Sequence, residues 1–338
     1  MSFSTLACPT WTLPQVNKIA VSSGYDGIEL RFLEGEDSLW KLPAFQGSAL
    51  AVSKRMISDN GLVIACVGTS CRFHSPDRTE RERWVEEGKR MAELAAALDS
   101  AGIRVFGDKI QPGADRDSTR NWIAEGVRCL AEQTKDDGVE VWLETHGDFA
   151  SSSETMRIIK QADCANAGVV WDPANCFTDG GEDPLEAALK FGTALRHVHL
   201  RDLNSHNSVW EPVLTGTGKL PLREIVANLN AIGYGRFVSF EWEKKWRPEL
   251  AEPEVAIPCV RRIPAQFVQS LRVWQVDWGE HVGVEDREGR AQDAKTQSDR
   301  CSYARGKERR APDAAQRVAN VQDLQFQTHF SSADATVS

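Results

Sequence analysis

The sequence lacks several features that would assign it to a membrane or to nucleic acid. None of its 338 residues belongs to a run approaching the ~18 consecutive apolar residues that span a bilayer. The N-terminus lacks the basic and apolar segments of a secretory signal peptide. Positive charge is not in excess, because 40 Lys and Arg face 49 Asp and Glu, a formal net charge of −9. Such a balance offers no general attraction for phosphates or anionic lipids. We therefore expect a soluble, cytoplasmic protein with neither a nucleic-acid nor a membrane partner.

Paired cysteines are missing as well. No two cysteines are spaced as CxxC, the pattern typical of zinc sites and redox disulfides. Several lie in apolar runs, where free thiols are commonly buried, and this favours a reducing compartment. The eight cysteines are Cys8, Cys66, Cys71, Cys129, Cys164, Cys176, Cys259 and Cys301.

The dinucleotide-binding fingerprint GxGxxG does not follow the first β-like run, which argues against a doubly wound nucleotide-binding sheet. The segment GTGK at residues 216–219 resembles part of a phosphate loop. It lacks the upstream glycine and the strand that should precede it. We interpret it as a turn that leads into a helix near Leu220.

Short apolar runs alternate with polar, helix-periodic segments along most of the chain. The runs are rich in Val, Ile, Leu or Phe and occupy residues 3–8, 27–31, 62–67, 103–106, 139–144, 167–172, 197–201 and 237–241. Between them, helices are predicted from Pro14 onward and at residues 77–100, 118–134, 153–162, 184–192 and 222–232. Alternation of this kind implies parallel strands joined by right-handed crossovers, and eight units close a barrel. The fold class predicted is α/β, a (β/α)8 TIM barrel.

The character of the sequence changes near Trp274. Residues 275–338 are dominated by Asp, Glu, Arg, Gln, Ser and Ala and show no apolar periodicity. Such a composition does not supply a packed core. We expect residues 1–274 to form the barrel, with a closing helix within residues 252–273, and residues 275–338 to form a polar, disordered tail.

Four of the later apolar runs end in a carboxylate or an imidazole, at Glu144, Asp172, His199 and Glu241. These residues are 28, 27 and 42 positions apart, as expected for one residue from each of four successive βα units. Strand ends of a barrel point into one mouth, and buried charges there must be paired or coordinated. Two Glu, one Asp and one His suit Mn²⁺, Mg²⁺ or Co²⁺, and the His also admits Zn²⁺. The sequence predicts one divalent metal ion bound by these four residues.

Four further polar residues are candidates for contact with a substrate. His146 is expected either to orient a substrate hydroxyl or to be a surface loop residue. Arg201 would attract an anionic group or form a salt bridge. Glu29 is expected to contact substrate or to pair with Arg31. Asn175 lies three residues beyond Asp172, in the same loop.

Several segments resemble one known family. They are SGYDGIELR (residues 23–31), LETHGDF (143–149), VVWDPAN (169–175), HVHLRD (197–202) and GTGKLPLREIVANLNAIGYGRFVSFEWE (216–243). In order and spacing they resemble the sugar phosphate isomerase/epimerase family with the xylose-isomerase-like barrel. The resemblance covers roughly residues 3 to 260. It implies metal ligands on successive strands at Glu144, Asp172, His199 and Glu241, the same set that the spacing predicts. Members often carry a His three residues after the metal-binding Asp, where this chain has Asn175.

The chemistry expected of such a site is proton transfer next to a carbonyl group. Removal of the proton gives an enediolate, which a divalent cation stabilises, and Glu144 and Glu241 are the expected proton carriers. We expect a metal-dependent isomerase or epimerase for a small sugar, keto-sugar or polyol-derived substrate. An inosose-type dehydratase and a non-catalytic sugar-binding barrel remain open as alternatives. The family also includes apurinic endonucleases, which need many His ligands. This chain has only seven His and a formal net charge of −9, and both numbers argue against an endonuclease. A homo-oligomer is compatible with the pattern, which does not set the number of subunits.

Overall fold

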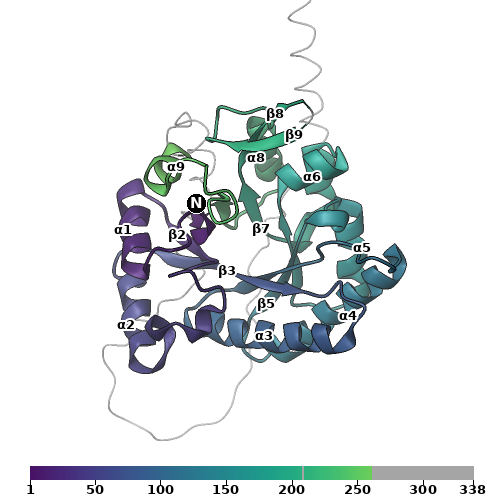
Figure 1. Cartoon of the computed structure of the whole chain (residues 1–338), viewed down its shortest axis with the longest axis horizontal. Helices are drawn as coiled ribbons and strands as arrows, with labels where there is room; N and C mark the ends of the chain where they lie inside the picture. Colours follow the sequence, from purple (N-terminus) through teal and green to yellow (C-terminus); the bar gives the residue numbers. More distant parts are fainter. Residues whose placement is uncertain (208, 261–338) are drawn as a thin grey trace, which may run out of the picture. The chain divides into compact units, whose positions relative to one another are not determined.

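The computed structural model describes residues 1–207 and 209–260, and within them eight parallel strands close into a barrel (Figure 1). Around the barrel the order is β1-β10-β7-β6-β5-β4-β3-β2, and pairing of β1 with both β10 and β2 completes the ring. The strands are β1 (Ser2–Ser4), β2 (Gly27–Leu30), β3 (Val63–Arg72), β4 (Gly102–Phe106), β5 (Glu140–Glu144), β6 (Ala167–Trp171), β7 (Leu195–Leu200) and β10 (Val238–Phe240). Each apolar run expected from the sequence overlaps one of these strands, so the predicted barrel is confirmed.

Helices lie outside the strands and form the outer ring of the barrel (Figure 1). They are α1 (Leu13–Ser23), α2 (Gly47–Ser58), α3 (Arg78–Ala97), α4 (Arg116–Thr134), α5 (Ser152–Ala162), α6 (Pro173–Gly180), α7 (Pro184–Phe191), α8 (Leu222–Ala231) and α9 (Pro253–Cys259). The sequence did not predict α2 or α6. Most of the expected closing helix, and the whole of the expected tail at residues 275–338, lie outside the described residues.

Aspartate side chains start several of these helices. Asp77 accepts a hydrogen bond from the backbone N–H of Thr79 at 2.9 Å, and Asp115 accepts one from Ser118 at 2.8 Å. An N-cap of this kind satisfies a backbone donor that has no partner inside the helix, and it contributes about 1 kcal/mol. Asp172 caps α6 in the same way, so a predicted metal ligand also fixes the start of a helix.

An antiparallel hairpin that the sequence did not predict follows β7. It consists of β8 (Asp202–His206) and β9 (Val209–Val213). Both segments are short, β8 is mostly polar and β9 contains a proline, so neither shows the apolar alternation that marks a strand. The hairpin lies at the same side of the barrel as α6 and α8 (Figure 1).

The GTGK segment that follows the hairpin is a turn, as expected, and it is organised by one carboxylate. Asp202 Oδ2 accepts hydrogen bonds from the backbone N–H groups of Gly216 at 2.9 Å and Gly218 at 2.8 Å. A Cβ at position 218 would lie 2.2 Å from Asp202 Oδ1, so the close approach requires glycine. The backbone N–H groups of these glycines therefore bind a carboxylate of the same chain.

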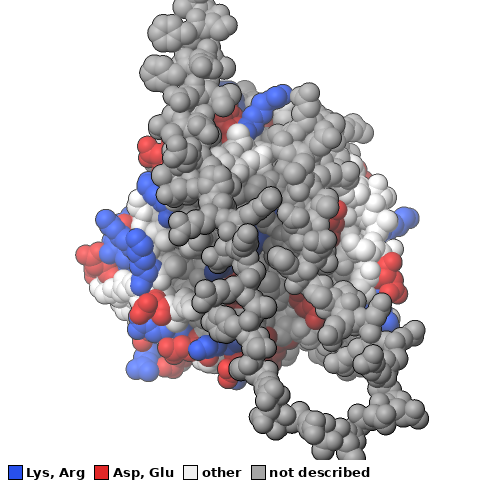
Figure 2. All heavy atoms as spheres, turned by 180° about the vertical axis from the view of Figure 1, so that it is seen from behind, with Lys and Arg blue, Asp and Glu red and all other residues white. Residues whose placement is uncertain are grey.

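Among the described residues, no helix is both long and apolar enough to cross a membrane. Basic and acidic side chains are interspersed over the described part of the face shown in Figure 2. That distribution agrees with the modest formal charge of −9.

The packing between α4 and the loop after β3 gives a stability prediction. A Cβ added to Gly126 would lie 2.3 Å from Phe73 Cγ and 2.6 Å from Phe73 Cβ, and Phe73 is fully buried. Overpacking a core typically costs about 1–3 kcal/mol. Alanine in place of glycine gains about 1 kcal/mol of helix propensity.

Gly126→Ala should therefore lower the free energy of unfolding, by up to about 2 kcal/mol, in denaturant titrations. Glu132→Ala, an exposed change on the same helix, is the control and should stay within about 0.5 kcal/mol of the parent chain. A Gly126→Ala chain more stable than the parent would contradict the packing argument.

The barrel is complete without the expected tail, and this gives a second prediction. Every strand of the ring lies between Ser2 and Phe240. A chain that ends at Trp274 should therefore keep the circular dichroism spectrum, melting temperature and metal content of the full chain. Loss of metal binding with unchanged folding would show that residues 275–338 contribute to the site.

Candidate active site

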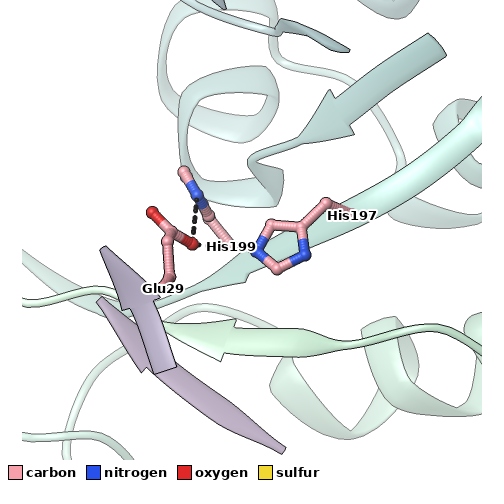
Figure 3. A group of neighbouring side chains, drawn as sticks. All are labelled: Glu29, His197 and His199. Carbon is pink, nitrogen blue, oxygen red and sulfur yellow. Dashed lines mark hydrogen bonds and ion pairs between the residues drawn. The ribbon is translucent and has the colours of Figure 1, made fainter. Parts of the chain in front are cut away.

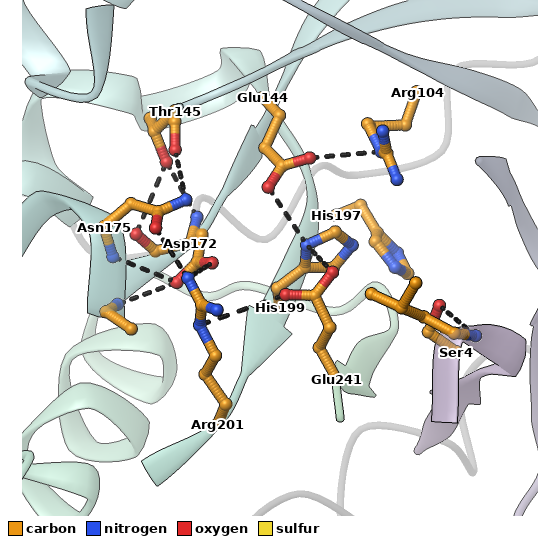
Figure 4. A network of polar contacts seen from close by, with 12 residues as sticks. Ser4, Arg104, Glu144, Thr145, Asp172, Asn175, His197, His199, Arg201 and Glu241 are labelled. Carbon is orange, nitrogen blue, oxygen red and sulfur yellow. Dashed lines mark hydrogen bonds and ion pairs between the residues drawn. The ribbon is translucent and has the colours of Figure 1, made fainter. Parts of the chain in front are cut away.

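The four residues predicted from the strand ends meet at one end of the barrel (Figure 4). Glu144 is the last residue of β5, Asp172 follows β6, His199 lies in β7 and Glu241 follows β10. His199 Nδ1 is 3.5 Å from Glu144 Oε1 and 3.5 Å from Glu241 Oε1. Glu144, Asp172 and His199 each offer one ligand atom within 4.8 Å of the others. All four side chains are buried.

Asp172 is held in place by the backbone around it. Its Oδ1 accepts hydrogen bonds from the N–H groups of Ala174 at 2.8 Å and Asn175 at 3.2 Å. Its own N–H donates to Thr145 Oγ1 at 2.8 Å, which ties the end of β6 to the end of β5. The second carboxylate oxygen is left to face the centre of the site, where Arg201 Nη2 approaches it at 2.9 Å.

Two buried arginines balance part of the negative charge. Arg104 Nε lies 3.1 Å from Glu144 Oε2. Arg201 contacts Asp172 and Glu243, and its Nε is 3.9 Å from Glu241 Oε2. The two glutamates therefore have different surroundings, since Glu144 has a close guanidinium partner and Glu241 has a distant one.

These surroundings move the pKa values of the site in different directions. Burial would raise the pKa of Glu144, but Arg104 and His199 outweigh it and lower the pKa to about 2. Burial raises the pKa of Glu241 to about 7, although His199 and Arg201 oppose the change. Burial also raises the pKa of Asp172. Burial would lower the pKa of His199, yet the carboxylates that surround the imidazole raise it well above its usual value.

The residues present fit a divalent metal ion. His199 Nδ1 is buried and has no hydrogen-bond partner, although two carboxylate oxygens lie 3.5 Å away. A buried polar atom without a partner is costly in a protein interior, and a cation between these groups would satisfy it. Three carboxylates and one imidazole are also the ligand types that Mn²⁺, Mg²⁺, Co²⁺ and Zn²⁺ use. Glu144, Asp172, His199 and Glu241 would hold the ion.

Three of the expected substrate-binding residues lie around this group. Asn175 donates from Nδ2 to the carbonyl of Thr145 at 2.9 Å and accepts from Arg201 Nη2 at 2.6 Å. Arg201 is salt-bridged, one of the two outcomes expected for it. The His146 side chain is 38% exposed, and its Nδ1 lies 3.6 Å from Asp108 Oδ1. Contact of these three residues with a substrate stays a prediction.

The expected pairing of Glu29 with Arg31 is wrong. Glu29 Oε2 instead lies 2.8 Å from His197 Nε2 and 3.1 Å from His199 Nε2 (Figure 3). Arg31 donates to Ser70 Oγ at 2.7 Å. The reason is the closed barrel, in which β7 lies across the interior from β2. Two imidazoles of β7 therefore reach the Glu29 carboxylate, which lies near Arg31 only in the sequence. Glu29 has no exposed surface, and its contact with a substrate stays a prediction.

Two residues of the site were missed by the sequence analysis. Arg104 sits inside the apolar run of β4, where a buried charge signals a buried partner. His197 is two residues before His199 on the same strand, so both side chains point to the same side of the barrel wall. The alternating pattern HVH carried that signal.

Comparisons with known proteins give similar folds at low sequence identity. A structure of L-ribulose 3-epimerase is 19% identical with a TM-score of 0.66, and the match covers 85% of this chain and 99% of that chain. The probable 3-DHS dehydratase AsbF of Bacillus anthracis is 17% identical, with a TM-score of 0.63. That match covers 78% of this chain and 99% of that chain. The IOLI protein with a binding zinc atom is 16% identical, with a TM-score of 0.63, 82% of this chain and 96% of that chain covered.

A curated sequence relative matches over a much shorter stretch. The γ-glutamyl phosphate reductase of Paramagnetospirillum magneticum is 28% identical over 123 residues. The match covers 33% of this chain and 29% of that protein, so the chain spans less than a third of this relative's length.

The family comparison covers most of the barrel. The model of the xylose isomerase-like TIM barrel family matches residues 18–262, which is more than half of the chain. That range contains all four residues of the proposed metal site, and the closed ring of parallel strands is the architecture the family is named for. The chain belongs to the xylose isomerase-like TIM barrel family.

Proposed function

We propose that this chain is a divalent-metal-dependent isomerase or epimerase that acts on a small sugar, keto-sugar or polyol-derived substrate through an enediolate. One observation carries the proposal: two glutamates from β5 and from the end of β10 approach the same unpartnered imidazole nitrogen, each at 3.5 Å. Similar structures include an L-ribulose 3-epimerase and a protein with a bound zinc atom, which supports the same class of chemistry.

The metal, when bound, would stabilise the negative charge that develops on substrate oxygen as a proton leaves the neighbouring carbon. The chain's own residues supply the rest. A carboxylate oxygen of Glu144 takes the proton, and Arg104, 3.1 Å from its other oxygen, keeps the side chain oriented. Glu241 delivers a proton to the neighbouring carbon or to the opposite face. The buried surroundings of both glutamates exclude water while the proton is held.

A dehydratase is the second candidate, favoured by the similarity to the probable 3-DHS dehydratase AsbF. Its first step is the same proton abstraction. The difference lies in the acid, which would protonate a leaving hydroxyl group in place of a carbon. The two candidates therefore share Glu144 as base and differ in what Glu241 protonates.

A proton-exchange screen tests the proposal, because exchange needs only the shared first step. Protein loaded with Mn²⁺, Co²⁺ or Zn²⁺ is incubated with ketoses and hydroxy-keto acids in deuterated water, and loss of C–H signals is followed by NMR. We expect exchange next to the carbonyl of at least one substrate, abolished by a chelator and restored by metal. A product with deuterium on the neighbouring carbon would then indicate isomerisation, a product with inverted configuration would indicate epimerisation, and loss of water would indicate dehydration.

The non-catalytic alternative is tested by the same experiment. A metal-loaded chain that binds a sugar in a thermal-shift assay and exchanges no proton in any member of the screen would contradict the proposed enzyme. Glu249→Gln is a suitable control, because this exposed carboxylate follows β10 without facing the site, and its exchange rate should equal that of the parent chain.

A further inference from the structure

A buried carboxylate beneath the proposed metal centre contacts two imidazoles. Glu29 lies in β2, while His197 and His199 lie in β7, and the contact crosses the interior of the barrel (Figure 3). Glu29 Oε2 is 2.8 Å from His197 Nε2 and 3.1 Å from His199 Nε2. The three residues have exposed fractions of 0%, 1% and 0%. These contacts are therefore shielded from bulk solvent.

The two nitrogens of His199 face different groups. Nε2 is at hydrogen-bond distance from Glu29, whereas Nδ1 faces Glu144 and Glu241 at 3.5 Å. An ionised carboxylate only accepts hydrogen bonds, so Nε2 must carry a proton to satisfy Glu29. Nδ1 is then the nitrogen that remains to offer a lone pair to a metal.

Burial of the Glu29 carboxylate costs solvation free energy, and this cost indicates that the carboxylate has a function. A buried carboxylate loses several kcal/mol of solvation, which a lysine or arginine usually offsets. No salt bridge joins Glu29 to such a residue in the described part of the chain, where its ion-pair partners are the two histidines. His197 is itself held by Trp142, whose ring stacks on it at 5.9 Å with an interplanar angle of 15°. The arrangement fixes the carboxylate from one side and directs it to His199 on the other.

We propose that Glu29 is a positioning residue that keeps the Nε2 proton on His199 and thereby presents Nδ1 to the metal, with His197 as the second donor that holds the carboxylate. This role of Glu29 rests on the proposed metal centre. It gives His199 a hydrogen-bond partner that the sequence analysis had expected to contact substrate or Arg31. Partners that orient a ligating histidine from behind in this way typically change metal affinity by ~10–100-fold when they are removed.

Metal affinity of Glu29→Gln is the first test. Zinc binding is measured by competition with a chromophoric chelator for the parent chain, for Glu29→Gln and for Glu154→Gln. Glu154 is paired with Arg120 at 3.0 Å on the outer ring, so its variant loses a carboxylate without touching the barrel interior. We expect the zinc Kd to rise by ~10–100-fold in Glu29→Gln. The Kd of Glu154→Gln should stay within twofold of the parent value.

The tautomer of His199 is the second test, and it remains decisive if Glu29→Gln does not fold. Two-bond ¹H–¹⁵N spectra of the zinc-loaded parent chain, with ¹⁵N-labelled histidine, show which ring nitrogen is protonated. The His199 signal is identified by its loss in His199→Asn. We expect a proton on Nε2 and zinc on Nδ1 in the zinc-loaded parent chain, and a weaker preference for this arrangement in folded Glu29→Gln loaded with zinc in the same way. A merely structural role for Glu29 would leave the tautomer unchanged.

The outcomes separate this inference from the proposed function. If the parent chain binds no zinc, both are wrong. If the parent binds zinc and a folded Glu29→Gln binds it equally well, or if Nδ1 carries the proton in the loaded parent, only the role of Glu29 is overturned. Binding of two zinc ions, one of them lost with Glu29, would also overturn it, because Glu29 would then be a ligand itself.

Discussion

Glu241→Gln is expected to lower the turnover of the substrate found by proton exchange by ~10²–10⁴-fold, the usual contribution of a general acid–base group. Glutamine keeps the length of the side chain and one oxygen that can approach a metal, so metal affinity should fall only moderately. It cannot exchange a proton at working pH, so the second proton transfer loses its carrier. Turnover is measured at saturating metal, which separates loss of chemistry from loss of metal.

Two results would count against this role of Glu241. If turnover at saturating metal stays within about tenfold of the parent value, the second proton transfer must be assigned to another group. His146 is the candidate that the sequence offers. An equal loss in Glu249→Gln, whose carboxylate is exposed, would show that the effect is not specific to the site.

Glu144→Gln and Asp172→Asn should each lose most of the bound metal while the fold remains. Both side chains are buried, and with His199 they offer ligand atoms that lie within 4.8 Å of one another. Glu241 is not part of that group, so we expect the loss of a charge at Glu144 or Asp172 to cost more metal affinity than the same loss at Glu241. The loss of affinity should exceed the ~10–100-fold typical of partners that only orient a ligand. Asn is also a good helix N-cap, so Asp172→Asn should keep the start of α6 intact. Metal content per chain after gel filtration gives the measurement.

The control for these variants is Asp163→Asn. Asp163 is exposed at the end of α5 and has a left-handed backbone conformation, with φ of 52°, which asparagine adopts readily. Its metal content should equal that of the parent chain. Full metal occupancy in both Glu144→Gln and Asp172→Asn would show that the ligand set is wrong.

Much of the architecture could be predicted because each barrel strand is a short, buried, apolar run. The run at residues 139–144 became β5, and its terminal Glu144 lies at the site because a parallel barrel brings all strand ends to one mouth. The four predicted metal-binding residues meet for the same reason. The hairpin of β8 and β9 was missed because β8 is mostly polar and β9, although richer in apolar residues, contains a proline and is largely unburied.

Contacts across the barrel could not be predicted from one strand at a time. Glu29 and Arg31 are two residues apart, and this proximity in the sequence made an ion pair one of the two expectations for Glu29. In the closed barrel the carboxylate meets His197 and His199, which are 168 and 170 residues away. Arg104 was missed for a similar reason, since its partner Glu144 belongs to the next strand and the apolar run conceals the charge.

Anomalous diffraction from crystals soaked in Mn²⁺ or Zn²⁺ tests the central claim most directly, because it locates the ion without reference to any substrate. We expect one peak per chain at bonding distance from His199 Nδ1 and from carboxylate oxygens of Glu144, Asp172 and Glu241, with Glu29 at His199 Nε2 on the opposite side. Soaked crystals with no peak among these residues, or with the peak at Nε2, would contradict it.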